Sequence, residues 1–427
     1  EWLLHPFSSY YNEFLVFELD GALSLHKLEQ AFTALCHKYT LLRSRFLQIN
    51  NQLYIEPNEH MTLPFEVLDV YSQSDQEMRE IITEVANRPF DLKTGPCWCA
   101  YLLRHSFSQK YYLVMVFHHI VMDGNSFEKL RIDLAHFYNH PAAIEQLKAK
   151  AYYDNQLQTY IGSENQAIEN QALDRCLNYY QDKLNGKSLH FDFSYADKQI
   201  NFLFPITAEL TQKIKKFCQQ RSCGPFRFVA SVFSIFLYNY FSKREICLAY
   251  AVNMKRSSHE EILGSFINLQ LLPINLSAES TFDQLFSQIS EARKAVEHFA
   301  LPYEKIIEHM QMRKVIDLSD SPNVVISETD LKLTALQLDS VKVTSMICHK
   351  TQSAYDISLE YGLHQNQIYF QLSIKNDWFT QDDYKQIQED FTFIIENAMK
   401  DPEIKLGSLY HTKSNLYHLE LASREDN

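Results

Sequence analysis

Glycine is scarce in this chain. Only 9 of its 427 residues are glycine, whereas an average usage of ~7% would give about 30. Loops that hold a phosphate need glycine where the backbone approaches the ligand closely, and the sequence contains neither a GxGxxG fingerprint nor a P-loop. These absences weigh against a nucleotide-binding function.

Clusters of positive charge are also missing. The chain has 40 lysine and arginine residues against 53 aspartate and glutamate residues, and its formal net charge is −13. No block of lysine and arginine occurs, and no basic stripe is interleaved with aromatic residues. Because contact with phosphate depends on such clusters, we expect no nucleic-acid partner.

The sequence lacks the signatures of several other classes. Its eight cysteines are scattered, and only Cys97 and Cys99 are close together, so no zinc-binding spacing is present and reduced thiols are expected. No GxSxG elbow marks a nucleophilic serine, which disfavours a covalent acyl-enzyme. Neither a signal peptide nor an apolar run of membrane-spanning length is found, so we expect a cytoplasmic protein with no membrane partner.

The most informative segment is His-His-Ile-Val-Met-Asp-Gly at positions 118–124. It follows an apolar run at 111–117 that predicts a buried strand, and it precedes Ser126, which is expected to begin a capped helix. Adjacent residues on a strand point to opposite faces, so His118 and His119 are not expected to share one role. One of them can face a cavity while the other supports the loop.

Two simpler interpretations of this segment stay open. The histidines can be core residues beside an Asp-Gly turn, which is a common turn. His119 and Asp123 can also be metal ligands, although the local sequence offers no third ligand.

Strands and helices alternate in two successive sets. The first set opens with a strand-like run at 13–19, followed by a helix for which Ser24 is the predicted cap. The second set contains a deeply buried helix over 228–240, a strand over 245–252 and a last helix that begins near Thr380.

These sets predict an α/β protein with two domains. A polar, turn-like stretch at 182–201 is the expected boundary, which gives domains 1–185 and 186–427. A hairpin over 356–374 is expected within the second domain.

Segment 118–124 has the HHxxxDG pattern of a superfamily of acyltransferases, and further motifs narrow the family. The sequence resembles a condensation domain of nonribosomal peptide synthetases, and the motifs agree in order and spacing along essentially the whole chain. The matching segments are KYTLLRSRF at 38–46, RPFDL at 88–92 with Gly95-Pro96, LGSFINL at 263–269, LPYE at 301–304 and YDISLE at 355–360. Segment 152–158 (YYDNQLQ) departs from the pattern, since it keeps a tyrosine and the aspartate of the family's YxDYAxW motif but lacks the second tyrosine and the tryptophan.

The resemblance implies a fold and a set of site residues. The expected fold is two chloramphenicol-acetyltransferase-like lobes in a V-shaped pseudo-dimer with a substrate tunnel between them. His119 is expected to be the catalytic residue and His118 to support the loop. Arg43 is expected to form an ion pair with Asp123 that holds the loop in place.

Three other residues are assigned to the site. Asn268 and Ser126 are expected beside the tunnel, although an asparagine in a loop often bonds only to backbone. Backbone N–H groups near Gly124, at the start of the following helix, are candidate oxyanion donors, and we count Gly124 with His119 in the catalytic set.

The resemblance also supplies a reaction and its partners. An acyl, aminoacyl or peptidyl thioester and an acceptor aminoacyl group each arrive on the phosphopantetheine arm of a carrier protein, and an amide bond joins them. The neutral imidazole of His119 can accept a hydrogen bond or a proton from the amine. No bound cofactor is expected, and the chain is expected to be a monomer. It has no GGxS carrier motif, so we expect the carriers to come from elsewhere, such as adjacent adenylation and carrier domains.

Three related functions share the fold or the motif. An acyltransferase that makes an ester or uses coenzyme A thioesters is not distinguished by segment 118–124. Epimerisation domains usually lack the glycine of this motif, and non-catalytic recruitment modules typically lack its second histidine. The presence of Gly124 and His119 therefore weighs against these last two functions.

Overall fold

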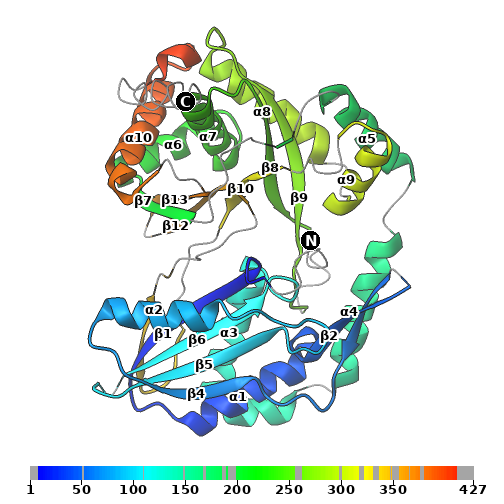
Figure 1. Ribbon diagram of the computed structural model, residues 1–427, viewed down its shortest axis with the longest axis vertical. Coiled ribbons are helices and arrows are strands. Elements are labelled where there is room, and N and C mark those ends of the chain that lie inside the picture. The colour runs from blue at the N-terminus through cyan, green and yellow to red at the C-terminus, as the bar shows by residue number, and fades with distance from the viewer. Residues whose placement is uncertain are drawn as a thin grey trace, which may run out of the picture. The chain divides into compact units, whose positions relative to one another are not determined.

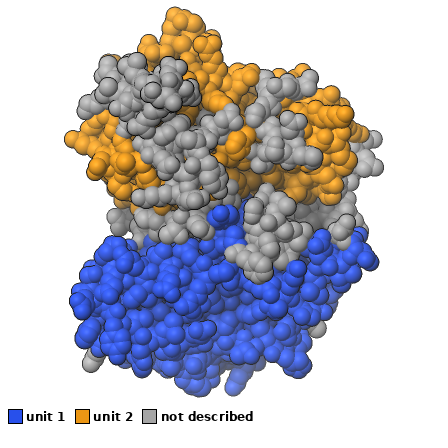
Figure 2. All heavy atoms as spheres, in the orientation of Figure 1, with its two compact units in different colours: residues 1–167, 255–267, 333–354 blue, residues 168–254, 268–332, 355–427 orange. Residues whose placement is uncertain are grey.

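The fold is described from a computed structural model of the 427-residue chain (Figure 1). The structure describes residues 8–410 except for 51, 109, 148–149, 167–169, 185–188, 191–198, 255–261, 298–300, 317–321, 330–335, 347, 349–354, 365 and 376–378. The chain divides into two compact units (Figure 2). Unit 1 contains residues 1–167, 255–267 and 333–354, and unit 2 contains residues 168–254, 268–332 and 355–427.

Neither unit is a continuous stretch of chain. The first change of unit lies between 167 and 168, and two later segments, 255–267 and 333–354, return to unit 1. The second of these adds strand β11 (Val341–Met346) to the sheet of unit 1. The domains predicted from the sequence, 1–185 and 186–427, therefore differ from the compact units, because a strand and a loop of unit 1 come from the second half of the chain.

Unit 1 is built on a five-stranded mixed sheet with the strand order β11-β1-β6-β5-β4. The pair β4–β5 is parallel and the other pairs are antiparallel. The remaining strands of this sheet are β1 (Asn12–Gly21), β4 (Phe65–Val70), β5 (Trp98–His105) and β6 (Tyr111–His118). A separate two-stranded ribbon is formed by β2 (Ser44–Ile49) and β3 (Gln52–Pro57).

Strand β6 is buried on both faces, as its apolar run predicts. Alternate residues on one face pack with helices α1 (Leu25–Lys38) and α3 (Gly124–Asn139), and those on the other face pack with α2 (Asp75–Ala86). The first group is Leu113, Met115 and Phe117, and the second is Tyr112, Val114 and Val116. Unit 1 is completed by the short helices η1 (Thr40–Arg43) and η2 (Pro141–Gln146) and by α4 (Lys150–Gln166).

Unit 2 contains a six-stranded sheet with the order β7-β13-β12-β10-β8-β9. Its strands are β7 (Gln199–Pro205), β8 (Glu245–Asn253), β9 (Ile267–Asn275), β10 (Val324–Glu328), β12 (Ile357–His364) and β13 (Gln367–Lys375). Its helices are α5 (Asn170–Leu184), α6 (Ala208–Gln220), α7 (Pro225–Phe241), α8 (Phe282–Glu297), α9 (Tyr303–Met312) and α10 (Tyr384–Lys400), with the short turns η4 (Gln381–Asp383) and η5 (Leu406–Ser408).

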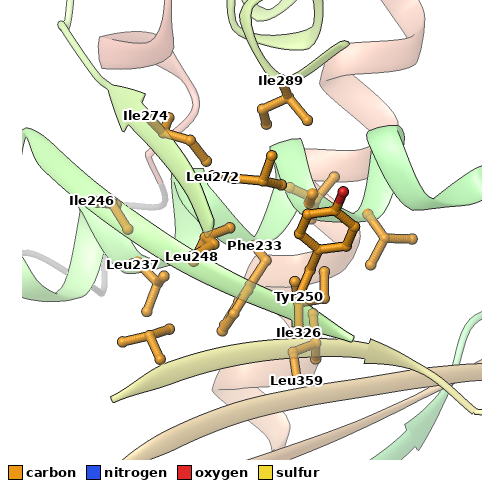
Figure 3. Packing of buried hydrophobic residues seen from close by; sticks show 14 of the residues in the cluster. Phe233, Leu237, Ile246, Leu248, Tyr250, Leu272, Ile274, Ile289, Ile326 and Leu359 are labelled. Carbon is orange, nitrogen blue, oxygen red and sulfur yellow. The ribbon is translucent and has the colours of Figure 1, made fainter. Parts of the chain in front are cut away.

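The core of unit 2 is apolar. Figure 3 shows residues of α7, α8 and four strands that converge in it. Helix α7 is buried over most of its surface and supplies Phe233 and Leu237, which explains why its sequence is apolar on nearly every side.

Four strands of each sheet follow one pattern. In β1-β6-β5-β4 and in β7-β13-β12-β10, the first two pairs are antiparallel and the last pair is parallel. In each unit the first strand leads to a helix, α1 or α6, and the hairpin leads to another, α3 or α10. Unit 2 therefore repeats the strand plan of unit 1.

The elements predicted from local patterns are confirmed. Strands occur at the predicted runs near 13–19 and 245–252, the helix over 228–240 is α7, and β12 and β13 form the predicted hairpin. Ser24 caps α1, since its side chain accepts the backbone N–H of Lys27 at 3.4 Å. Within the described ranges, no helix combines the length and apolarity that crossing a membrane requires.

Candidate active site

His118 is the last residue of β6, and only 5% of its surface is exposed. Its Nδ1 accepts a hydrogen bond from the backbone N–H of Ile120 at 3.1 Å, and its ring centroid lies 5.9 Å from that of Tyr11. Burial, together with a smaller effect of the neighbouring His119, lowers the pKa of His118 to about 4. The ring is therefore neutral near pH 7 and stabilises the turn with its proton on Nε2.

His119 begins the turn after β6 and is half-buried. Its backbone N–H donates to the carbonyl of Tyr11 at 2.7 Å, and the N–H of His118 donates to the carbonyl of Cys97 at 2.8 Å. Because these two carbonyls lie just before β1 and β5, the turn is bound to both neighbours of β6. The imidazole Nδ1 of His119 lies 3.2 Å from Oγ of Ser265. The two histidines thus have separate partners.

Asp123 is the N-cap of helix α3 and is almost completely buried. One of its carboxylate oxygens accepts the backbone N–H of Ser126 at 2.8 Å, and the other accepts the backbone N–H of Phe266 at 2.8 Å. The helix begins at Gly124, earlier than the start predicted at Ser126, because Asp123 rather than the serine supplies the cap.

Ser126 connects helix α3 to residues 262–267, which we call the 262–267 segment. Its hydroxyl donates to the carbonyl of Gly264 at 2.7 Å and accepts the N–H of the same residue at 3.1 Å. The sequence predicts Ser126 beside a substrate tunnel, but its side chain is fully buried, and its hydroxyl both donates and accepts within unit 1. Ser126 is therefore a structural link rather than a residue with an open face.

Gly124 is the first residue of α3 and is exposed. A Cβ atom added to it would meet no atom within 4 Å, so the space beside this helix start is open. Among the described residues, no group accepts a hydrogen bond from the backbone N–H of Gly124 or Asn125. The first N–H groups of a helix have no partner within the helix and carry partial positive charge. This helix start can therefore bind an oxyanion.

Arg43, the last residue of η1, pairs with a different aspartate from the one predicted. Its Nη2 lies 2.6 Å from Oδ1 of Asp154, which also accepts the hydroxyl of Thr40 at 2.6 Å. The predicted ion pair between Arg43 and Asp123 is wrong, because both oxygens of Asp123 face backbone N–H groups. Arg43 is buried with 3% of its side chain exposed, and the described residues offer no hydrogen-bond partner to its Nε and Nη1. Asp154 thus compensates the charge of Arg43 from the side of Nη2.

Asn268 lies on strand β9 in unit 2. Its Nδ2 donates to the carbonyl of Leu301 at 2.6 Å, and its Oδ1 accepts the backbone N–H of Tyr303 at 2.9 Å. Both ends of the amide thus hold the chain at the start of helix α9. This is the simpler of the two roles considered for Asn268, and its place beside a tunnel stays a prediction.

Two functional contacts were not foreseen from the sequence. Ser265 occupies the variable position of the LGSFINL motif, and Asp154 belongs to segment 152–158, which departs from the family pattern. Both residues lie in segments that match family motifs, but their partners, His119 and Arg43, are 146 and 111 positions away. In the described part of the chain, no group of three or more histidine, cysteine, aspartate or glutamate side chains is arranged to hold a metal ion.

Solved structures with the same fold include domains of peptide synthetases. The first condensation domain of the calcium-dependent antibiotic (CDA) synthetase aligns with a TM-score of 0.71 and 15% identity, covering 95% of this chain and 94% of that one. The X-domain from teicoplanin biosynthesis aligns with a TM-score of 0.76 and 16% identity, covering 95% and 94%. These likenesses confirm the predicted α/β fold of two chloramphenicol-acetyltransferase-like lobes. The V-shaped arrangement and the tunnel stay predictions.

Related sequences are found within much longer proteins. Gramicidin S synthase 2 of Brevibacillus brevis is 23% identical over 406 residues, which cover 92% of this chain and 9% of that protein. Surfactin synthase subunit 2 of Bacillus subtilis (strain 168) is 23% identical over 414 residues, which cover 93% of this chain and 11% of that protein. This chain therefore spans only a small part of each of these relatives.

A family model decides the assignment. The model described as "Condensation domain" matches residues 2–416, which is nearly the whole chain. That match includes the HHxxxDG segment, whose histidines, cap and following helix are described above. The chain belongs to the condensation-domain family of nonribosomal peptide synthetases.

Proposed function

We propose that this chain catalyses amide-bond formation between two substrates that are bound to carrier proteins. The donor is an acyl or aminoacyl thioester on one phosphopantetheine arm, and the acceptor is an aminoacyl group on another. The acceptor's amine nitrogen attacks the thioester carbonyl carbon, the C–N bond forms and the C–S bond breaks. The donor's phosphopantetheine leaves as a thiol after it receives the proton that the amine gives up.

The observation that carries this proposal is the environment of His119. The imidazole is half-buried and its Nδ1 lies beside Oγ of Ser265; when Nδ1 carries the ring proton, Nε2 can accept a hydrogen bond or the proton of the amine. The backbone that carries His119 is bound to both neighbouring strands. A ring on a fixed backbone can orient the amine while it accepts the proton, and orientation of two bound substrates is itself worth several kcal/mol, about 7–11 in ideal cases.

The start of helix α3 has a complementary role. Attack on the thioester places negative charge on the carbonyl oxygen, and the exposed N–H groups of Gly124 and Asn125 are suited to stabilise that charge. Glycine at position 124 keeps the approach open, since any side chain there would stand in the space beside the helix start. His118 and Asp123 contribute indirectly by fixing the turn and the helix start.

The carriers are the partners that the proposal requires. The relatives named above are multidomain synthetases or their subunits, and another neighbour in structure is a four-domain nonribosomal peptide synthetase with a TM-score of 0.78. We propose that adjacent or separate carrier proteins deliver both substrates, and that no cofactor is bound by this chain itself.

The test is a single-turnover reaction between a donor carrier loaded with an acyl group and an acceptor carrier loaded with an aminoacyl group, followed by intact mass spectrometry. Transfer of the acyl mass to the acceptor carrier is the expected result. A matched acceptor with a hydroxyl group in place of the amine, and a matched donor on coenzyme A, distinguish amide formation on carriers from the ester-forming and coenzyme A-dependent alternatives. Transfer only to the hydroxyl acceptor would replace the proposed reaction with ester formation.

A second candidate function is recruitment without catalysis. The observation that favours it is the fold likeness to the X-domain from teicoplanin biosynthesis, which also appears in a solved complex with OxyB. In that case the chain would bind a partner protein, and none of the loaded carrier pairs would yield a product. Intact His119 and the open helix start at Gly124 favour catalysis, since recruitment needs neither.

A further inference from the structure

We infer that Ser265 is a positioning residue that selects the reactive tautomer of His119. This inference rests on the proposed function, in which Nε2 of His119 receives the amine's proton or hydrogen bond. The contact that motivates it is the 3.2 Å distance between Nδ1 of His119 and Oγ of Ser265. Both residues belong to unit 1 although 146 positions separate them.

A neutral imidazole carries its proton on only one of its two nitrogens, and the partner of one nitrogen decides the state of the other. If Nδ1–H donates to the serine oxygen, Nε2 keeps its lone pair and can serve as the acceptor. If the serine O–H donates to Nδ1, the proton lies on Nε2 and the ring cannot accept there. Ser265 is half-buried, so its own hydroxyl proton can point to water while its oxygen accepts from His119. The accepting arrangement is therefore available to it.

The hydrogen bond from Nδ1 of His119 to Ser265 can persist both before and after His119 takes up a proton. When His119 takes a proton on Nε2, both ring nitrogens become donors. A serine oxygen that already accepts from Nδ1 continues to do so, so the ring does not need to turn between the two states. A donating serine would have to reverse its hydroxyl at that moment.

The backbone around Ser265 is fixed on both sides. The preceding residue, Gly264, is bound through its N–H and its carbonyl to the hydroxyl of Ser126, and the following residue, Phe266, donates its N–H to Asp123. A Cβ at Gly264 would lie 3.2 Å from a methyl carbon of Leu41 and 3.3 Å from the Phe266 ring, so this segment is closely packed. Helix α3 and the 262–267 segment thus hold the serine oxygen at a defined place beside His119.

The matched variants are Ser265→Thr and Ser265→Val, because threonine and valine have the same shape and only threonine keeps the hydroxyl. We expect the valine variant to lose about 3- to 10-fold in the single-turnover rate, the effect of one hydrogen bond, and the threonine variant to stay within about 2-fold of the parent. In the His119→Ala background, Ser265→Val should cause no further loss, since the serine acts through the histidine. Ser265→Ala, which adds no volume, replaces the valine variant if valine lowers the melting temperature.

A spectroscopic readout tests the tautomer without any turnover. In protein labelled with 15N-histidine, with the His119 signals identified by their absence from His119→Ala, we expect a protonated Nδ1 in the parent and in Ser265→Thr. A change of the Nδ1 and Nε2 shifts is expected in Ser265→Val. Identical His119 spectra in the threonine and valine variants, or an unprotonated Nδ1 in the parent, would overturn the inference. If the spectra behave as expected but no carrier pair gives a product, the proposed function fails and the tautomer assignment stands.

Discussion

The two units share a strand plan but differ at the helix that follows each hairpin. In unit 1, the hairpin β5–β6 leads to α3, and in unit 2 the hairpin β12–β13 leads to α10 through the turn η4. The cap of α3, Asp123, also bonds to Phe266, which is 143 positions away. The start of η4 is instead closed by a capping box between Thr380 and Asp383, three positions apart.

This difference distinguishes contacts that are needed to form the helix from contacts that are needed to arrange the candidate active site. In unit 2, a local capping box begins the turn η4, and helix α10 follows directly from that turn. The long-range bonds of unit 1 add no strand or helix, but they bind the HHxxxDG turn to the 262–267 segment and place Ser265 beside His119. We therefore attribute these bonds to the site, and the following predictions, in order of decreasing effect, test that attribution.

The largest effect on stability is expected at Asp154. Asp154→Ala removes the carboxylate that pairs with the buried Arg43, and we expect the free energy of unfolding to fall by ~3–5 kcal/mol. Arg43→Met is the matched control, because it leaves an aspartate with 26% of its side chain exposed, which water can solvate, and it should cost less, about 1–2 kcal/mol. Urea unfolding followed by circular dichroism measures both. A smaller loss for Asp154→Ala than for Arg43→Met would contradict this view of the pair.

The same variants decide which aspartate is the partner of Arg43. In double-mutant cycles, Arg43 and Asp154 should show strong coupling, whereas Arg43 and Asp123 should be additive to within about 0.5 kcal/mol. Coupling between Arg43 and Asp123 alone would restore the ion pair that the resemblance implied.

The next effect concerns the long-range cap itself. Asp123→Ala removes the N-cap of α3 and leaves the buried N–H of Phe266 without an acceptor, so we expect a loss of about 2–4 kcal/mol and of most amide formation. Urea unfolding and the single-turnover assay report the two losses. An Asp123→Ala protein that forms the amide at the parent's rate would show that the active site does not depend on this cap.

The buried His118 should make the stability of the protein depend on pH. Its pKa is about 4 in the folded state against an ordinary value of 6.5, so the unfolded chain binds a proton first as the pH falls. The free energy of unfolding should therefore decrease from pH 6.5 down to 4, by about 2 kcal/mol at pH 5. His118→Asn, whose side-chain oxygen can still accept the N–H of Ile120, should lack this contribution. An equal loss between pH 7 and pH 5 in both proteins would exclude it.

The smallest effect is expected in unit 2. Thr380→Ala removes the threonine side chain from the local capping box, and it should cost about 1 kcal/mol and leave amide formation unchanged. The melting temperature and the single-turnover rate are the measurements. A loss of activity as large as that of Asp123→Ala would mean that the two helix starts do not differ in function.

Local patterns in the sequence predicted the strands and helices, but they did not predict the contacts between residues that are far apart in the chain. The apolar run before His118 predicted β6 and its burial, because a central strand is apolar on both faces. Ser24 and Thr380 predicted helix starts, because capping depends on residues three positions apart. The motifs located His119 and Asp123 in the chain as well.

The partners of those residues depend on packing. Arg43 pairs with Asp154 rather than Asp123, because both are carboxylates and only the fold decides which of them lies close to the guanidinium. The contact between Ser265 and His119 is of the same kind. A serine in the variable position of a motif carries no local signal of what it touches.

The measurement that tests the central claim most directly is single-turnover amide formation by His119→Ala. With a loaded donor carrier and a loaded acceptor carrier, the variant should fold as the parent does and lose about 10²–10⁴-fold in rate, the range for a residue that transfers a proton. A smaller but measurable loss would assign His119 to positioning of the amine. Formation of the amide at the parent's rate by a folded His119→Ala protein would contradict the account, because His119 would then not be the reactive residue.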